Sequence, residues 1–374
     1  MHRTNLLLAL LLASAAPLSA TAERPLVPLP VPGTGQWSAG AAGDHFEFVV
    51  AGDNRAAARD LPPPPTAGEI FREVRLLRPS FCLWTGDTIY GSDDTVGEAE
   101  QEYDAFLNSA AAAATPIFNA PGNHEIFKRA DLERLYARRM GPLFGSFDAG
   151  RSHFIALDTE ELGRPPGIGD AQRAWLEHDL EQNRGAAHIF VFMHHPLFPK
   201  DKTDGFGNRA NRDAIHRLFV QYHVAYVFSG HEHLYYASVH DGVHYVVTGG
   251  GGAPTDAAPE DGGFQNYVVV QVDGDRVTTT VLQPWRLFSS SGPVAPDNST
   301  STIVSNYNHD PVTVTVGFPA ARPAGEMEAT AAWTYKGKSH PIAATIVPAG
   351  QPGITAVQVT VPRDRAALVS LRAK

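Results

Sequence analysis

The sequence predicts an α/β domain followed by a smaller all-β module, on two observations. Between residues 45 and 284, short apolar runs of strand length alternate with amphipathic helical patterns, which is typical of a layered α/β domain. Beyond a serine- and proline-containing segment, only strand-length patterns remain. We therefore expect an α/β domain over 45–287, a linker over 288–300, and a small β-sandwich-like module over 301–374.

The individual elements follow in chain order. Six apolar runs are expected as strands, at 46–51, 81–85, 116–119, 154–158, 189–193 and 225–229. Four amphipathic stretches between them are expected as helices, at 69–77, 98–114, 171–183 and 212–222. Four further strands are expected without intervening helices, at 235–239, 243–248, 267–272 and 277–282. The β module is expected to contain strands at 312–316, 329–335, 342–346, 356–361 and 367–371.

The N-terminus has the pattern of a secretory signal peptide. Arg3 gives a positive start, a leucine- and alanine-rich run follows, and Ala20–Ala22 fits a cleavage site before Glu23. The apolar run is shorter than the about 20 residues that span a bilayer. We expect residues 1–22 to be removed, residues 23–44 to form an extended leader, and the mature protein to be exported, to the periplasm or beyond, without a membrane span. A retained N-terminal anchor is the alternative.

Charge and cysteine content limit the possible partners. The formal net charge is −10, and loss of Arg3 with the signal leaves −11. Nucleic-acid-binding proteins carry basic faces, so nucleic acid is not expected as the main partner. A small phosphorylated substrate remains possible, because bound metal cations reverse the local field. Cys82 is the only cysteine, so no internal disulfide can form.

Polar side chains follow five of the predicted strands, in the loop after each strand. Ligand-binding loops of α/β sheets lie at these carboxyl ends. Each loop alone is weak evidence, because Gly-Asp and Gly-Asn pairs commonly form turns. Together they supply two aspartates, an asparagine and three histidines in order, which indicates a metal site. The loops are Gly52–Arg55, Gly86–Tyr90, Gly122–Glu125, His194–Pro196 and Gly230–His233.

This ordered set, GD…GDxxY…GNHE…VxxH…GHxH, resembles the calcineurin-like metallophosphoesterases, and in particular the purple acid phosphatases, over roughly residues 45–285. The resemblance implies a four-layer αββα sandwich for the α/β domain. It also implies two metal ions bridged by Asp87. The implied ligands of the first ion are Asp53, Asp87, Tyr90 and His233, and those of the second are Asp87, Asn123, His194 and His231.

Two residues decide which branch of the superfamily applies. Most members have a metal-binding histidine two residues after the first aspartate, whereas this chain has Arg55, which cannot bind a metal. Tyr90 lies where purple acid phosphatases supply a phenolate, and a hard, highly charged ion is needed to stabilise that anion. We therefore expect Fe(III) at the Tyr90 site and Fe(II), Zn or Mn at the second. The alternative is that Tyr90 only packs beside the site, and Arg55 also differs from the glycine usual in purple acid phosphatases.

The implied function is hydrolysis of phosphoesters, most readily phosphomonoesters, by a metal-bound hydroxide. His124 would protonate the leaving oxygen or stabilise the phosphoryl oxygens. His195 would be a second donor or would orient its neighbour His194. Arg55 would bind the substrate phosphate or pair with a nearby carboxylate. Glu125 would orient His124.

Two other functions remain open at this point. Phosphodiesterase activity needs the same two metals and is a variant of the same site. A non-catalytic binding protein on a degenerate metallophosphoesterase scaffold is the other, and Arg55 in a ligand position is its only support. Metal content and hydrolysis of aryl phosphates distinguish a hydrolase from the non-catalytic binding protein.

Overall fold

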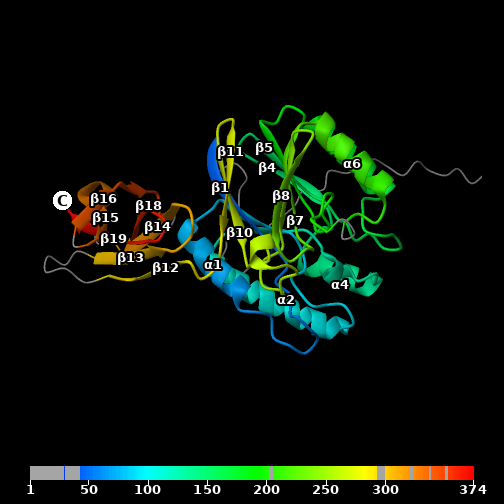
Figure 1. The fold of residues 1–374 in the computed structure, drawn as a ribbon, viewed down its shortest axis with the longest axis horizontal. Helices are drawn as coiled ribbons and strands as arrows, with labels where there is room; N and C mark the ends of the chain where they lie inside the picture. Colours follow the sequence, from blue (N-terminus) through cyan, green and yellow to red (C-terminus); the bar gives the residue numbers. More distant parts are fainter. Residues whose placement is uncertain are drawn as a thin grey trace, which may run out of the picture.

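The computed structural model describes Leu29 and residues 43–201, 205–292, 300–319, 323–336, 338–349 and 353–374. The predicted signal peptide (1–22) lies outside these residues, as does most of the predicted leader (23–44). Within them, an α/β domain and a β module lie side by side, as Figure 1 shows. No helix of the described part is long and apolar enough to cross a membrane.

Two sheets form the centre of the α/β domain. The first has the order β11-β10-β1-β2-β3, with β1, β2 and β3 parallel. Its strands are β1 (His45–Ala51), β2 (Phe81–Trp84), β3 (Ile117–Asn119), β10 (Tyr267–Asp273) and β11 (Arg276–Leu282). The second has the order β4-β5-β6-β7-β9-β8, with β5, β6, β7 and β9 parallel. Its strands are β4 (Gly145–Ala149), β5 (Ser152–Ala156), β6 (His188–Phe192), β7 (Val224–Ser229), β8 (Tyr235–His240) and β9 (Val243–Thr248).

The residues of β1 show why the two sheets pack together. Phe46, Phe48 and Val50 alternate along the strand and lie in the core between the sheets, because successive side chains of a strand point to opposite faces. Val49 and Ala51, on the other face, join the core beneath the helices. Aromatic rings from both sheets fill the space between them, and a strand buried on both faces reads as a continuous apolar run.

Helices cover the outer face of each sheet and complete four layers. α1 (Thr66–Leu77), α2 (Val96–Ala110) and α4 (Ala130–Arg139) share a core with β1, β2 and β3. α5 (Asp170–Gln182) and α6 (Arg209–Gln221) share another with β5, β6 and β7. The predicted αββα sandwich is therefore confirmed. Three short helical turns also occur in the described part of this domain, α3 (Asn123–Ile126) and the 3₁₀ turns Ala111–Ala113 and Pro259–Asp261.

The C-terminal module consists of two antiparallel sheets, as expected for a small β-sandwich. One has the order β12-β13-β19-β15-β16, and the other has the order β14-β18-β17. The strands are β12 (Leu287–Ser291), β13 (Thr300–Asn306), β14 (Val312–Pro319), β15 (Met327–Tyr335), β16 (Lys338–Ile342), β17 (Ala344–Val347), β18 (Ile354–Val361) and β19 (Arg365–Ala373).

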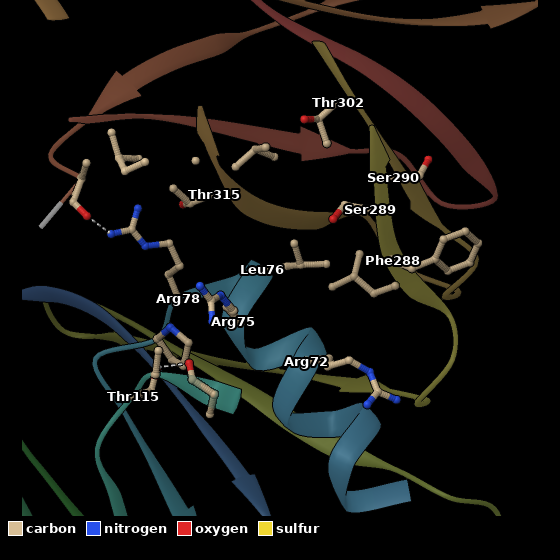
Figure 2. Close-up of a pocket in the computed structure, with 18 of the residues that line it drawn as sticks. Arg72, Arg75, Leu76, Arg78, Thr115, Phe288, Ser289, Ser290, Thr302 and Thr315 are labelled. Atoms are coloured by element: carbon tan, nitrogen blue, oxygen red, sulfur yellow. Dashed lines mark hydrogen bonds between the residues drawn. The ribbon is translucent and has the colours of Figure 1, made fainter. Parts of the chain in front are cut away.

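The module packs against α1, and its core is continuous with the core beneath that helix. Glu73 on α1 joins the two parts: its carboxylate accepts a hydrogen bond from the Tyr267 hydroxyl at 2.5 Å and another from the Leu287 backbone N–H at 3.1 Å. Figure 2 shows the side of this junction where the last turn of α1 faces β12 and β14.

Three details differ from the sequence prediction. Residues 288–291, expected in the linker, belong to strand β12, because Leu287 is buried and the strand pairs with β13. Residues 342–346, expected as one strand, divide between β16 and β17, which lie in different sheets. The sequence pattern did not predict strand β13, nor β4 and α4, which connect the third and fourth predicted strands.

Candidate metal centre

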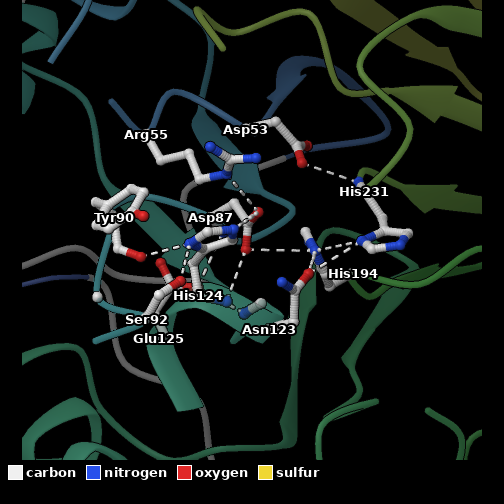
Figure 3. A network of polar contacts seen from close by, with 12 residues as sticks. Asp53, Arg55, Asp87, Tyr90, Ser92, Asn123, His124, Glu125, His194 and His231 are labelled. Carbon is white, nitrogen blue, oxygen red and sulfur yellow. Dashed lines mark hydrogen bonds and ion pairs between the residues drawn. The ribbon is translucent and has the colours of Figure 1, made fainter. Parts of the chain in front are cut away.

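The five polar loops meet at one edge of the domain, where the carboxyl ends of the parallel strands of both sheets converge. Backbone hydrogen bonds connect the loops directly. The Asp53 N–H donates to the Gly86 carbonyl at 2.9 Å, and the Gly230 N–H donates to the His194 carbonyl at 3.0 Å. Figure 3 shows the side chains that these loops direct toward one another.

Three candidate ligands have a left-handed backbone, with φ of 61° at Asp53, 52° at Asp87 and 72° at His231. Such conformations are uncommon outside glycine and are concentrated at functional sites. The close approach of the loops has a second requirement. A Cβ at Gly230 would lie 2.1 Å from Asp53 Oδ2, so only glycine fits there. The local backbone is therefore arranged around the aspartates.

The tightest part of the site surrounds His194 Nε2. This atom lies 2.9 Å from Asn123 Oδ1, 3.3 Å from Asp87 Oδ1 and 3.2 Å from His231 Nδ1. His231 Nδ1 is in turn 3.0 Å from Asn123 Oδ1. Ligand atoms around an octahedral divalent cation at 2.0–2.1 Å lie about 3 Å from one another. These spacings fit a shared cation.

The contacts of His194 show which of its ring nitrogens carries the hydrogen and which has a free lone pair. Its Nδ1 lies 2.8 Å from the Thr85 carbonyl oxygen, which can only accept, so Nδ1 carries the hydrogen. Nε2 then has a lone pair directed at other acceptors. Burial lowers the pKa of His194 to about 4, which keeps the imidazole neutral near neutral pH. This is the arrangement of a metal-binding histidine whose second nitrogen is held by a carbonyl.

Asp53 and His233 form a looser second part of the site. Their closest atoms, Asp53 Oδ1 and His233 Nε2, are 3.8 Å apart. His233 Nδ1 lies 2.8 Å from the Pro254 carbonyl, so its Nε2 also has a free lone pair. Asp53 Oδ1 accepts the His231 backbone N–H, whereas Oδ2 is buried without a hydrogen-bond partner in the described structure. An orphaned carboxylate oxygen fits a missing cation.

Arg55 and Tyr90 lie beside this second part. Arg55 Nε is 3.4 Å from Asp87 Oδ2, so the guanidinium pairs with the predicted bridging carboxylate. The Tyr90 ring lies beside the His124 ring, with centroids 5.6 Å apart, and its hydroxyl has no hydrogen-bond partner among the described residues. The geometry therefore brings both residues to the site, with Arg55 already in contact with a candidate ligand.

The two central aspartates have opposite electrostatic environments. Burial and the neighbouring Asp87 charge raise the pKa of Asp53 well above its usual value. Burial also opposes ionisation of Asp87, but its interactions with His194, His124 and Arg55 outweigh burial and lower the Asp87 pKa. Asp87 is therefore the carboxylate that Arg55 and the imidazoles of the site surround.

His124 points its Nε2 atom at the centre of the site, 4.0 Å from Asp87 Oδ2. Its Nδ1 contacts the Tyr90 carbonyl and lies 2.9 Å from the Ser92 hydroxyl. Because the carbonyl can only accept, Nδ1 carries a hydrogen and Nε2 is the nitrogen free to exchange a proton.

Glu125 does not orient His124, contrary to the sequence prediction. Its carboxylate accepts the backbone N–H groups of Asp87 at 2.9 Å, Thr88 at 2.5 Å and Gly122 at 2.8 Å. It therefore connects the loop of Asp87 to the turn that carries Asn123. Burial and the Asp87 charge raise the pKa of Glu125 to about 7.

Two carboxylates that support the site were not among the predicted site residues. Glu160 lies 2.5 Å from His195 Nδ1, and the His195 ring lies against the His231 ring with centroids 3.7 Å apart. Glu232, between two candidate ligands, accepts the N–H groups of Lys200 at 2.8 Å and Asp201 at 2.6 Å. Glu160 follows a predicted strand but belongs to none of the motifs above, whereas Glu232 occupies the variable position of the GHxH motif, which was a usable signal.

Comparison with known families supports the same assignment. Residues 63–235 match the family model of calcineurin-like phosphoesterases. The match contains all the candidate ligands except Asp53, which lies just before it together with Arg55.

Several characterised phosphatases are similar to part of the chain. Serine/threonine-protein phosphatase CPPED1 of Danio rerio is 26% identical over 185 residues, 46% of this chain and 59% of that protein. Phosphoenolpyruvate phosphatase of Allium cepa is 28% identical over 210 residues, 49% of this chain and 43% of that protein. Purple acid phosphatase 23 of Arabidopsis thaliana is 30% identical over 134 residues, 32% and 29% of the two chains. The chain thus spans 59% or less of the length of these relatives.

Solved structures share the fold. A purple acid phosphatase from seeds of yellow lupin (Lupinus luteus) has a TM-score of 0.54 at 17% identity, covering 65% of this chain and 52% of that one. A dimetal phosphatase from Danio rerio has a TM-score of 0.51 at 15% identity, covering 63% and 95%. Residues 63–235 of this chain therefore match the calcineurin-like phosphoesterase family, and the α/β domain that contains them has the fold of the purple acid phosphatase and the dimetal phosphatase named above.

Proposed function

We propose that this chain hydrolyses phosphomonoesters in a metal-dependent reaction at the site around Asp87. One observation carries the proposal. The lone pair of His194 Nε2 faces the acceptor oxygens of Asn123 and Asp87 at 2.9 and 3.3 Å. Acceptors repel one another at this distance unless a cation lies among them, and the neutral imidazole has no second hydrogen to donate.

The donor set fits two cations that share Asp87. The proposed ligands are Asp87, Asn123, His194 and His231 for one ion, and Asp53, Asp87, Tyr90 and His233 for the other. Fe(III) is proposed for the Tyr90 side, with Fe(II), Zn or Mn at the imidazole-rich side. When bound, such ions polarise a phosphoryl oxygen and stabilise the charge that develops in phosphoryl transfer.

The residues around the metals have distinct proposed roles. His124 Nε2 faces the centre with its other nitrogen fixed by Tyr90, which suits a group that gives a proton to the leaving oxygen. The Glu160 carboxylate holds His195 Nδ1, so its Nε2 is available to a phosphoryl oxygen. Arg55 would have to leave Asp87 to bind substrate, so we propose that it helps to set the charge of the site.

Two further observations support a phosphomonoester substrate and a location of the enzyme outside the cytoplasm. The relatives named above include a phosphoenolpyruvate phosphatase and a protein phosphatase, whose names both describe phosphomonoester substrates. The signal-peptide pattern of residues 1–22 supports export to the periplasm or beyond.

Metal quantitation combined with a substrate panel tests the proposal. Purified mature protein should contain about two metal ions per chain and should hydrolyse p-nitrophenyl phosphate and alkyl monoesters faster than bis-p-nitrophenyl phosphate. Faster diester hydrolysis would assign a phosphodiesterase instead. Less than one bound metal, with no hydrolysis of either class, would favour the non-catalytic binding protein.

The His124→Ala variant tests the proton-transfer role separately. It should keep both metals and lose about 10²–10⁴-fold in kcat, the usual contribution of general acid catalysis. Alkyl phosphates should be affected more than p-nitrophenyl phosphate, because the poorer leaving group needs the proton more. Equal losses on both substrates would exclude a leaving-group acid.

A further inference from the structure

A second cavity lies at the junction of α1 and the β module, away from the metal centre. It has a volume of about 880 Å³ and lies among the last turn of α1, β12 and β14 (Figure 2). None of the candidate metal ligands lines it. Small-molecule sites have volumes of this order and are often found between domains. We call this cavity the junction groove.

Three arginines line the junction groove at a spacing of three residues. Arg72 is already paired with Glu69, with Nε 3.0 Å from Oε2. Arg78 donates to the carbonyl oxygen of Ala349 in the β module, which leaves its charge uncompensated. Arg75 has no ion-pair partner within the described part of the chain and is exposed to solvent. The groove therefore carries two uncompensated positive charges on a chain of net charge −10.

The β module provides hydroxyl groups on the other side of the groove. Ser289 and Ser290 belong to β12, Thr302 to β13 and Thr315 to β14, and all four line the cavity. Figure 2 shows Ser289, Thr302 and Thr315 on the module side, opposite the arginines of α1, whereas the Ser290 side chain lies on the other side of β12. Hydroxyls can donate to anionic oxygens, so both walls of the groove offer donors.

The negative partial charge at the C-terminus of α1 disfavours a bound anion, but it is smaller than the positive charge of the arginines. A helix C-terminus carries a partial charge of about −0.5. The last turn of α1 is closed by the Arg78 N–H, which donates to the Val74 carbonyl at 2.8 Å. Two full positive charges on flexible side chains exceed that partial charge.

We propose that the junction groove is a second, non-catalytic binding site for a phosphate-bearing anion. The planar fork of a guanidinium matches two phosphate oxygens, and Arg75 and Arg78 supply two such forks. The serine and threonine hydroxyls complete the contacts from the module side. A bound phosphate thereby bridges α1 to the β module and stabilises the junction. This site does not depend on the proposed hydrolase function.

Phosphate binding to the Asp87→Asn variant of the full mature chain tests the proposal. In that background hydrolysis is blocked, so both inorganic phosphate and a sugar phosphate can be titrated by calorimetry at constant ionic strength. We expect saturable binding at the groove and a rise of about a few degrees in the thermal midpoint. Adding Arg75→Gln and Arg78→Gln to this variant should abolish both the binding and the rise in the thermal midpoint. If only the sugar phosphate binds, the ligand is an organic phosphate. If inorganic phosphate binds as well, the phosphate group alone is sufficient for recognition.

Two matched variants make the result specific. Arg138→Gln removes an exposed arginine on α4, away from the groove, and should leave the titration unchanged. Arg75→Lys with Arg78→Lys keeps the charge but removes the forks, and should weaken binding at least about tenfold. The proposal is overturned if Arg75→Gln/Arg78→Gln protein, shown to be folded by circular dichroism, binds phosphate as the parent does, or if the parent binds none.

Discussion

The two parts of the metal centre differ in how closely the protein assembles them. Around His194, atoms of Asn123, Asp87 and His231 lie 2.9–3.3 Å away. Around Asp53, the candidate ligand atom His233 Nε2 is 3.8 Å away, and Arg55 contacts the shared Asp87. Because Arg55 is a fixed cation, it competes with a metal ion for the same carboxylate. We therefore expect the imidazole-rich position to bind its metal more tightly than the Tyr90 position.

The largest effect is expected from Asp87→Asn, which removes the ligand common to both positions. Loss of at least about 5.5 kcal/mol of charge stabilisation corresponds to a decrease in kcat/KM of at least about 10⁴-fold. Metal content should fall below one ion per chain. Asp93→Asn, a neighbouring exposed aspartate, serves as the control and should behave like the parent. Retention of both metals would show that Asp87 does not bridge them.

Asn123→Ala and Asp53→Asn remove one ligand from each position and compare the two directly. We expect Asn123→Ala to lose the tightly bound ion and at least about 100-fold in activity. Asp53→Asn should release the more weakly bound ion and leave the other in place. Metal titration by inductively coupled plasma mass spectrometry during stepwise chelation distinguishes them. If both variants release the same ion first, the difference between the two positions is not real.

Arg55→Gln should strengthen the weaker position. Removal of a partly buried cation next to Asp87 should raise metal affinity there at least about tenfold. Arg59→Gln is the control, because Arg59 pairs with Glu98 at 2.9 Å. Competition with a fluorescent chelator measures the affinity. An increased KM with unchanged metal affinity would instead show that Arg55 binds the substrate phosphate.

The smallest change in rate is expected from Tyr90→Phe, about tenfold or less, because the other three ligands of its position remain. If Fe(III) is bound there, the parent should have a visible phenolate-to-iron absorption band that this variant lacks. Tyr103→Phe changes a buried tyrosine outside the site and should keep the band. A colourless, fully active parent loaded with manganese or zinc would contradict tyrosine ligation.

The parts of the fold that the sequence predicted well are those buried on both faces. The run around Phe48 is apolar throughout because it lies between two packed layers, so its strand character is visible locally. Strand β12 was not predicted because the serines of this edge strand resemble the composition of a linker. Its strand conformation depends on pairing with β13, which is a tertiary contact.

The candidate site was predictable where ligands follow strands in a fixed order. Asn123, His194 and His231 could be identified because the carboxyl ends of parallel strands converge. The role of Glu125 and the identity of the carboxylate that pairs with Arg55 could not, because they depend on which loop each side chain meets in space. Glu125 binds the backbone of the Asp87 loop, and Arg55 pairs with Asp87 itself.

The junction between the two parts of the molecule contains a carboxylic acid that favours its neutral form. Burial raises the pKa of Glu73 to about 7, and the hydrogen bonds from Tyr267 and Leu287 offset this only in part. An unfolded glutamate titrates near 4.3, so the folded chain holds an extra proton between these two values. The contribution of Glu73 to the stability of the folded chain is therefore greatest in acidic surroundings, and it is lost as pH rises through about 7. The seam between the two parts is thus suited to an acidic milieu.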